Sequence, residues 1–422
     1  MPMSSVHSAL PGIHLLPLYR ALPRHQPLTL DLLVTVTPPL PKLTRDRVPL
    51  NLSLVIDRSG SMQGEKIHYA QMAARFAVEH LLPSDRLSVV LFDHQVETLV
   101  ASTLATDKAR VLAQIAQIRT RGSTDLHGGW LEGGVQVSQY LHKERLNRVI
   151  ILSDGLTNVG ETRLDTIASH VQGLAQMGVS TTTLGIGDDY DENLLAAMAL
   201  SGEGNFVHIQ TSTQLPEIFE TELAGLVATL GQRVRLTLKT QIGVKVLSVL
   251  NDFDVTPEGD YKLPNLLVGV PIQVVVRLQI PAQTTPQKLL GLQLSWQNGG
   301  GDRQVIKAVL ALPLVEPDRM ADFPAHPLVQ EQVALLTAAR ARREAISLGD
   351  RGDYAGARQV LKDARLSMVD LPISAHLTID ATLLEELELA YEEGQSSQTR
   401  KRALSQAYNL SRQGKSDPRR SM

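Results

Sequence analysis

A chain of 422 residues is about three times as long as a typical single domain, so two or three domains are expected. Hydrophobic residues make up 43% of the chain and charged residues 20%, which excludes a wholly disordered or fibrous protein. The absence of cysteine excludes disulfides and thiolate metal sites, and the net charge of -3 argues against a general attraction to nucleic acid.

The N-terminal segment, residues 1–47, contains one strand candidate at residues 28–36. This run has no local partner in the sequence, and a lone strand is not stable. We therefore expect it to pair with strands that follow residue 231. Such pairing would make the intervening region an insertion into a β-sandwich.

No apolar stretch of the sequence is suited to span a membrane. The two longest, residues 28–36 and 265–280, are too short or carry polar and charged residues such as Asp31 and Arg277. Residues 1–27 have no charged lead ahead of their apolar residues, and prolines interrupt them. We expect a protein that has no membrane span and resides in the cytoplasm.

Residues 48–230 alternate short aliphatic runs with amphipathic stretches of helical length, a pattern typical of a doubly wound α/β domain with a mostly parallel sheet. The predicted strands are 50–56, 86–92, 96–100, 147–152, 179–186 and 204–209. The predicted helices are 66–82, 107–118, 127–141, 165–177, 191–200 and 213–230. Since residues 96–100 follow the preceding strand after a short link, they can pair with it only as an antiparallel edge strand.

The pattern changes twice after residue 230. Residues 231–318 form strand-like runs with no helix between them, which predicts a β-sandwich domain. These runs are 233–240, 244–250, 271–280, 289–297 and 304–314. Residues 319–415 are rich in Ala, Leu, Arg and Glu at helical spacing and predict a C-terminal helical region, followed by a disordered tail at 416–422. The helices expected there are 329–347, 354–366, 381–393 and 398–412.

The predicted fold class is therefore α/β. A doubly wound, mostly parallel sheet is inserted into a β-sandwich, and a helical segment follows at the C-terminus.

Five polar residues lie where strands and loops reach one edge of the predicted α/β sheet. Asp57, Ser59 and Ser61 follow the first strand, Thr124 precedes a Gly-rich helix start, and Asp154 follows a neighbouring strand. Ligands of open α/β sheets bind at this edge, so we expect the five side chains to converge. Three hydroxyls and two carboxylates are hard oxygen ligands that suit Mg²⁺, or Mn²⁺ or Ca²⁺, rather than zinc or copper. If the carboxylates act mainly through water, the ion seeks one further anionic oxygen, which a Glu or Asp of a partner protein can supply.

The order of a DxSxS motif, then Thr, then Asp resembles the metal-ion-dependent adhesion site of the von Willebrand factor type A (VWA) domain. The resemblance covers residues 48–230, and the longer chain is similar to bacterial intracellular proteins that carry this domain. It implies that Ser59 and Ser61 coordinate the ion directly and that Asp57 holds water molecules. Thr124 and Asp154 would exchange direct and water-mediated contacts.

Other interpretations of these motifs are weaker. The DxSxS segment alone could be an ordinary capped turn, because Asp and Ser both bond turn amides, but Thr124 and Asp154 favour the metal site. The acidic run at 188–192 opens a helix, where carboxylates are favourable in any case, so helix capping is favoured over a second cation site. Residues 60–66 lack the spacing of a phosphate-binding loop. The Arg-Gly-Asp tripeptide at 351–353 matches an integrin-ligand sequence, but we expect it at a turn between helices and interpret the match as chance.

These residues favour a non-enzymatic module that binds an acidic residue of a partner protein through Mg²⁺. The alternative, suggested by the resemblance to bacterial relatives, is a regulatory or adaptor subunit of a MoxR-like AAA+ ATPase system. A metal-dependent phosphoesterase is disfavoured because the motif provides no positioned nucleophile or general base. No nucleic-acid partner is expected.

Overall fold

The computed structural model describes residues 10–39, 48–187, 190–209, 211–216, 218, 229–298, 301–369, 371, 374–393, 404–405 and 407–408. The chain divides into two compact units. One comprises residues 45–229 with 299–301, and the other comprises residues 1–44, 230–298 and 302–422.

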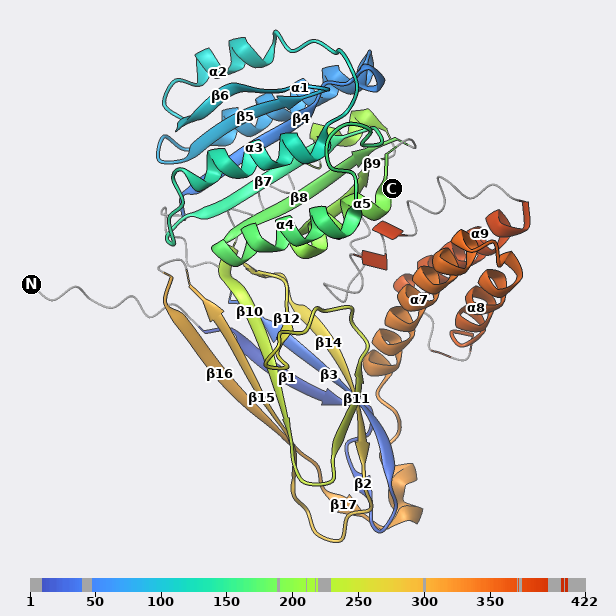
Figure 1. Ribbon diagram of the computed structural model, residues 1–422. Coiled ribbons are helices and arrows are strands. Elements are labelled where there is room, and N and C mark those ends of the chain that lie inside the picture. The colour runs from blue at the N-terminus through green and yellow to red at the C-terminus, as the bar shows by residue number, and fades with distance from the viewer. Residues whose placement is uncertain are drawn as a thin grey trace, which may run out of the picture. The chain divides into compact units, whose positions relative to one another are not determined.

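The first unit contains a six-stranded sheet in the order β6-β5-β4-β7-β8-β9 (Figure 1). Its strands are β4 (Leu50–Asp57), β5 (Arg86–Phe92), β6 (Val96–Leu104), β7 (Leu146–Ser153), β8 (Val179–Ile186) and β9 (Glu203–Ile209). All six strands predicted for this region are confirmed. Strand β6 pairs antiparallel with β5 at the edge of the sheet, as predicted, whereas the other neighbours are parallel.

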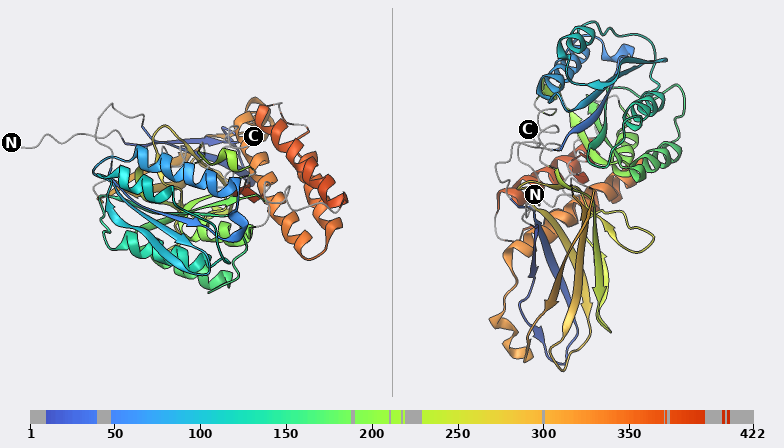
Figure 2. Two further views of the ribbon diagram at one scale, coloured as in Figure 1. Left: turned by 90° about the horizontal axis from the view of Figure 1, so that it is seen from above. Right: turned by 90° about the vertical axis from the view of Figure 1, so that its left-hand side faces the viewer.

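Helices cover both faces of this sheet (Figures 1 and 2). They are α1 (Glu65–His80), α2 (Lys108–Ile115), α3 (Leu126–Ser138), α4 (Leu164–Met177) and α5 (Glu192–Ser201). Each agrees with a predicted helix to within a few residues at either end. Of the sixth predicted helix, 213–230, the structure describes the short turn η2 (Ser212–Gln214) and the helical residues 215, 216 and 218. The prediction is wrong at residues 229–230, which begin strand β10 (Thr229–Thr240), and the remaining residues lie outside the described ones.

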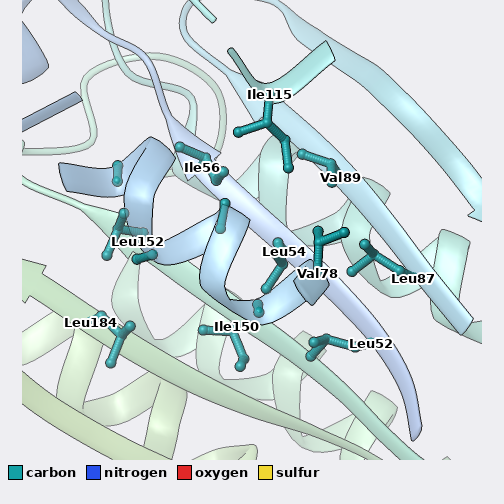
Figure 3. Close-up of a cluster of buried hydrophobic side chains, with 14 of the residues drawn as sticks. Leu52, Leu54, Ile56, Val78, Leu87, Val89, Ile115, Ile150, Leu152 and Leu184 are labelled. Carbon is teal, nitrogen blue, oxygen red and sulfur yellow. The ribbon is translucent and has the colours of Figure 1, made fainter. Parts of the chain in front are cut away.

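Alternate residues of the central strands serve the two faces. Figure 3 shows Leu52, Leu54 and Ile56 of β4 gathered with Val78 of α1 and Ile115 of α2 in a buried apolar cluster. Burial on both faces explains why these strands are almost continuously aliphatic in sequence.

Helix α3 packs against the opposite face of the sheet. A Cβ added at Gly133 would lie 2.4 Å from Val55 Cγ2, and one added at Gly129 would lie 2.6 Å from the ring of Phe92. The glycines of α3 therefore permit a close approach to the sheet. This approach places the start of α3 at the sheet edge where β4 and β7 end.

The second unit contains two larger sheets. The first has the order β1-β3-β14-β11, and in the second β12-β10-β15-β16 is extended by β13 pairing with β10. The strands of the first sheet are β1 (Gly12–Pro17), β3 (Leu28–Thr37), β11 (Lys245–Val249) and β14 (Ile272–Ile280). Those of the second are β10 (Thr229–Thr240), β12 (Tyr261–Lys262), β13 (Leu266–Leu267), β15 (Lys288–Gln297) and β16 (Arg303–Ala311). A short parallel pair joins β2 (Leu22–Pro23) to β17 (Leu314–Val315).

Strand β3 pairs antiparallel with β14 along its length, which confirms the predicted pairing of residues 28–36 with the region after 231. The premise that residues 28–36 have no local partner is wrong, because β1 pairs with the other side of β3. Pro17 at the end of β1 disguised this strand in the sequence. An edge strand tolerates a proline that a central strand does not.

Side chains from both sheets form one buried apolar cluster, which includes Leu32 and Val276 of the first sheet and Leu236 and Leu294 of the second. An ion pair links β3 and β14 in the middle of the first sheet. Arg277 lies opposite Asp31 in the register and donates two hydrogen bonds to it, at 2.7 and 2.9 Å.

The same unit ends in helices α7 (Pro327–Asp350), α8 (Tyr354–Leu366) and α9 (Ala375–Glu393), after a short 3₁₀ turn η3 (Pro317–Asp322). These confirm three of the predicted helices, although α7 and α9 begin earlier than predicted. Residues 351–353 form the predicted turn, in which Asp353 caps α8. The fourth predicted helix, 398–412, lies outside the described residues except at 404–405 and 407–408, which are helical. The predicted tail, 416–422, lies wholly outside them.

Helices α7 and α9 share a buried ion pair between Arg342 and Asp380, whose side chains are 1% and 3% exposed. Throughout the described ranges, every helix is too short or too polar to cross a lipid bilayer.

Candidate metal site

The structure brings the five predicted site residues together at one edge of the α/β sheet. Asp57 is the last residue of β4, and Asp154 directly follows β7, its parallel neighbour in the sheet. Ser59 and Ser61 lie at the 3₁₀ turn η1 (Gly60–Met62) that connects β4 to α1. Thr124 precedes α3.

Asp57 is buried and held by its neighbours. Its carboxylate accepts hydrogen bonds from the backbone N–H of Ser59 at 2.8 Å and from Ser153 Oγ at 2.6 Å. Burial raises the pKa of Asp57 from 3.8 to about 6, against the lowering effect of these hydrogen bonds, and the nearby charge of Asp154 raises it further. A cation beside Asp57 would favour its ionised form.

The three hydroxyl oxygens surround a common point. Ser59 Oγ lies 3.0 Å from Ser61 Oγ, which in turn donates to Asp154 Oδ1 at 2.8 Å. A Cβ built on Gly155 would lie 3.3 Å from Ser61 Oγ, 3.4 Å from Thr124 Oγ1 and 4.0 Å from Ser59 Oγ. We call the space between Gly155 and these three hydroxyl oxygens the cradle. Because residue 155 is glycine, no side chain fills it.

This donor set fits a hard divalent cation. Hydroxyl and carboxylate oxygens are ligands for Mg²⁺, Mn²⁺ or Ca²⁺, and neither a thiolate nor an imidazole takes part. Among the residues that the structure describes, no three His, Asp or Glu side chains gather so as to hold a metal ion. A metal centre in this part of the chain therefore depends on the hydroxyl ligands.

Three residues at the site were not predicted from the sequence. Lys66 of α1 lies with its Nζ 2.5 Å from Asp154 Oδ2, and Ser153 bonds Asp57. Asn158 clamps Thr124: its Oδ1 accepts from Thr124 N at 2.9 Å, and its own N–H donates to Thr124 O at 3.1 Å. The sequence carries little signal for these contacts.

An ion-pair network adjoins the site. The buried Arg58 donates to Asp93 at 2.7 Å and pairs with Glu97 at 2.8 Å, while Arg121 donates to Asp93 at 2.8 Å. Burial alone would raise the pKa of Asp93, but hydrogen bonds from Arg121, from the Gln95 amide and from Arg58 lower it below its usual value. Arg121 N also donates to Arg58 O, so the network ties the loop after β4 to the loop before α3.

Two nearby carboxylates serve as helix caps. Asp125 accepts from Gly128 N at the start of α3, and Asp191 accepts from Leu194 N at the start of α5. The capping prediction is thus confirmed for Asp191, while residues 188–189 lie outside the described residues.

Comparison with known proteins identifies the α/β domain. Residues 51–221 match the family model of the von Willebrand factor type A domain. An uncharacterized protein of Synechocystis sp. is 30% identical over 177 residues, which cover 41% of this chain and 40% of that protein. Inter-alpha-trypsin inhibitor heavy chain H2 of Mus musculus is 31% identical over 187 residues, which cover 41% of this chain and 20% of that protein. The chain thus spans less than half the length of either relative.

Two solved structures resemble most of the chain in fold. The von Willebrand factor type A protein from Catenulispora acidiphila covers 91% of both chains, with a TM-score of 0.69 and 16% identity. The ArnB paralog VWA2 from Sulfolobus acidocaldarius covers 98% of this chain and 100% of its own, with a TM-score of 0.61 and 19% identity. The chain therefore contains a VWA domain with a mixed α/β sheet, together with a C-terminal helical region.

Proposed function

We propose that the chain is a non-enzymatic binding module whose VWA domain holds Mg²⁺ at an intact metal-ion-dependent adhesion site and binds a Glu or Asp side chain of a partner protein. Mn²⁺ and Ca²⁺ suit the same oxygen ligands. VWA domains commonly mediate protein-protein interactions. The bacterial intracellular type and the cytoplasmic location expected from the sequence are part of this proposal.

The observation that carries the proposal is the cradle at Gly155, where three hydroxyl oxygens converge beside two buried carboxylates. Ser59 and Ser61 would hold the ion directly, and Asp57 would act through water. Thr124 and Asp154 would exchange direct and water-mediated contacts. When bound, the ion supplies a Lewis acid with affinity for one more anionic oxygen.

The hydrogen bonds at the site support binding rather than catalysis. Ser59 Oγ contacts Ser61 Oγ, and Ser61 Oγ contacts Asp154, so neither serine bonds a histidine in the described part of the chain. A serine nucleophile is activated by an adjacent general base, most often an imidazole. This arrangement therefore favours hydroxyls that act as metal ligands.

The order of the strands supports the proposal that the second unit is a β-sandwich into which the VWA domain is inserted. Its sheets combine β3, which precedes the VWA domain in sequence, with strands that follow it. We propose that the VWA domain is an insertion into a β-sandwich, because sandwich strands lie both before and after it in the chain.

The proposed function is tested by affinity capture. The full chain is immobilised and exposed to native lysate in Mg²⁺ or in chelator, with an Asp154→Ala bait as the matched control. We expect proteins that are retained only by the wild-type bait and only in Mg²⁺. Retention that is identical with and without the metal would contradict the proposal, and recovery of an AAA+ ATPase in the Mg²⁺ fraction would favour the adaptor alternative.

Filling the cradle should weaken metal binding without unfolding the domain. We expect Gly155→Ala to lower Mg²⁺ affinity at least about tenfold, because the new methyl group meets Ser61 Oγ and Thr124 Oγ1 at close range. Gly173→Ala is the matched control, since a Cβ there has no neighbour within 4 Å, and it should stabilise α4 by up to about 1 kcal/mol. Calorimetric Mg²⁺ titration of both variants makes the comparison, and equal affinities would contradict the assignment of the cradle.

Metal binding should stabilise the protein in a pH-dependent manner. Because the pKa of Asp57 is raised from 3.8 to about 6 by folding, the metal-free protein loses stability from this group as the pH rises through that window. The loss is complete above the folded pKa and amounts to about 3 kcal/mol. Mg²⁺ favours the ionised carboxylate, so the Mg²⁺-induced rise in Tm should be large at about pH 7.5 and small at about pH 5. Thermal unfolding with and without Mg²⁺ measures it, and an equal rise at both values would contradict the role of Asp57.

A further inference from the structure

Lys66 contributes a positive charge inside the candidate metal site. Its Nζ lies 2.5 Å from Oδ2 of the fully buried Asp154, while its own side chain is 28% exposed. A Cβ built on Gly187, directly after β8, would lie 3.8 Å from both Cε and Nζ of Lys66. The ammonium is therefore held between the carboxyl ends of β7 and β8.

The two oxygens of Asp154 have different partners. Oδ1 accepts from Ser61 Oγ, one of the hydroxyls of the cradle, whereas Oδ2 accepts from Lys66. The hydroxyl of Ser61 and the ammonium of Lys66 thus bind separate oxygens of one carboxylate. A cation held by the hydroxyls does not require Lys66 to leave.

The charges of Asp57, Asp154 and Lys66 determine the charge of the site once a divalent cation is bound. Asp57 and Asp154 together neutralise a divalent cation, so among the groups that contact the cradle and its two carboxylates the ammonium of Lys66 adds one positive charge. The nearby carboxylate of Asp125 bonds Gly128 N at the start of α3 and is not part of this sum. The neighbouring network does not alter this sum, because Arg58 and Arg121 are matched by Asp93 and Glu97. Solvent and salt screen the interaction between the partly buried ammonium of Lys66 and an ion beside Asp154 only weakly.

We propose that Lys66 sets the ligand preference of the site: its ammonium weakens the binding of the divalent cation and strengthens the binding of a carboxylate to the occupied site. This inference rests on the proposed function. The two effects have opposite signs because like charges repel and opposite charges attract at one location. A lysine that served only to hold the loops in place would change both affinities in the same direction.

The test replaces Lys66 with methionine, which keeps the length of the side chain and removes its charge. We expect Lys66→Met to bind Mg²⁺ more tightly, by a factor on the order of ten, in calorimetric titration. At saturating Mn²⁺, acetate should bind more weakly by a similar factor, measured as the fall in water-proton relaxation when acetate displaces water from the bound ion. Circular dichroism verifies that the variant is folded, and Lys66→Arg, which keeps the charge, should resemble the wild type in both affinities.

Lys108→Met is the matched control for net charge. Lys108 donates to Glu79 O near the far end of α1, about 20 Å along the helix from Lys66, so neither affinity should change. Any result for Lys66→Met other than tighter Mg²⁺ binding with weaker acetate binding overturns the inference. Absence of Mg²⁺ binding in the wild type would instead overturn the proposed metal site itself.

Discussion

Asp57→Asn should produce a folded protein that does not bind Mg²⁺ and that, without metal, is more stable than the wild type at about pH 7.5. The carboxylate of Asp57 is buried, and folding raises its pKa from 3.8 to about 6. Ionisation at neutral pH therefore costs the metal-free protein about 3 kcal/mol, which an uncharged amide avoids in part. Chemical unfolding in chelator measures the gain, and calorimetry measures the loss of Mg²⁺ binding.

Asp93→Asn is the matched control for this variant. Asp93 is equally buried, but hydrogen bonds from Arg121, from the Gln95 amide and from Arg58 lower its pKa. Its charge stabilises the fold above the unfolded pKa, so removing that charge should destabilise the protein at neutral pH. If both variants destabilised the metal-free protein to the same extent, or if Asp57→Asn still bound Mg²⁺, the electrostatic account of the site would be wrong.

Arg342→Met should destabilise the C-terminal helical region by about 3–5 kcal/mol, because it leaves Asp380 buried without a partner. The double variant Arg342→Met with Asp380→Leu should recover most of this loss, since neither charge then remains buried. The exposed pair Arg358–Glu392, 42% and 54% exposed, is the control, and Arg358→Met should cost no more than about 1 kcal/mol. Urea unfolding followed by circular dichroism compares the variants, and a small loss for Arg342→Met would contradict the structural role of the pair.

The elements of the VWA domain were predictable because its central strands are buried on both faces. Their aliphatic runs are unambiguous, and Asp or Gly marks the ends of several helices. Strand β1 was missed because Pro17 is uncommon in strands, although it is acceptable at an edge. The pairing of β3 with β14 was predicted correctly, although the premise that β3 has no local partner was wrong.

Of the candidate site, only the five residues of the motif could be predicted from the sequence. Asp57, Ser59 and Ser61 lie in one short segment that directly follows a strand. Thr124 and Asp154 are far from them in sequence but stand where a helix begins and a strand ends, so the sheet topology places them at the same edge. Lys66 contacts a residue 88 positions away and Asn158 one 34 positions away, so their roles depend on how the loops meet in space. Sequence spacing does not carry that information.

The proposed metal site is tested most directly by locating the metal and its ligands in a crystal. Crystals of the full chain grown with Mn²⁺ and acetate would be measured at the manganese absorption edge. We expect one anomalous peak bonded to Ser59 Oγ and Ser61 Oγ, with an acetate oxygen completing its coordination. Manganese bound elsewhere, or bound at these hydroxyls with acetate excluded, would contradict it.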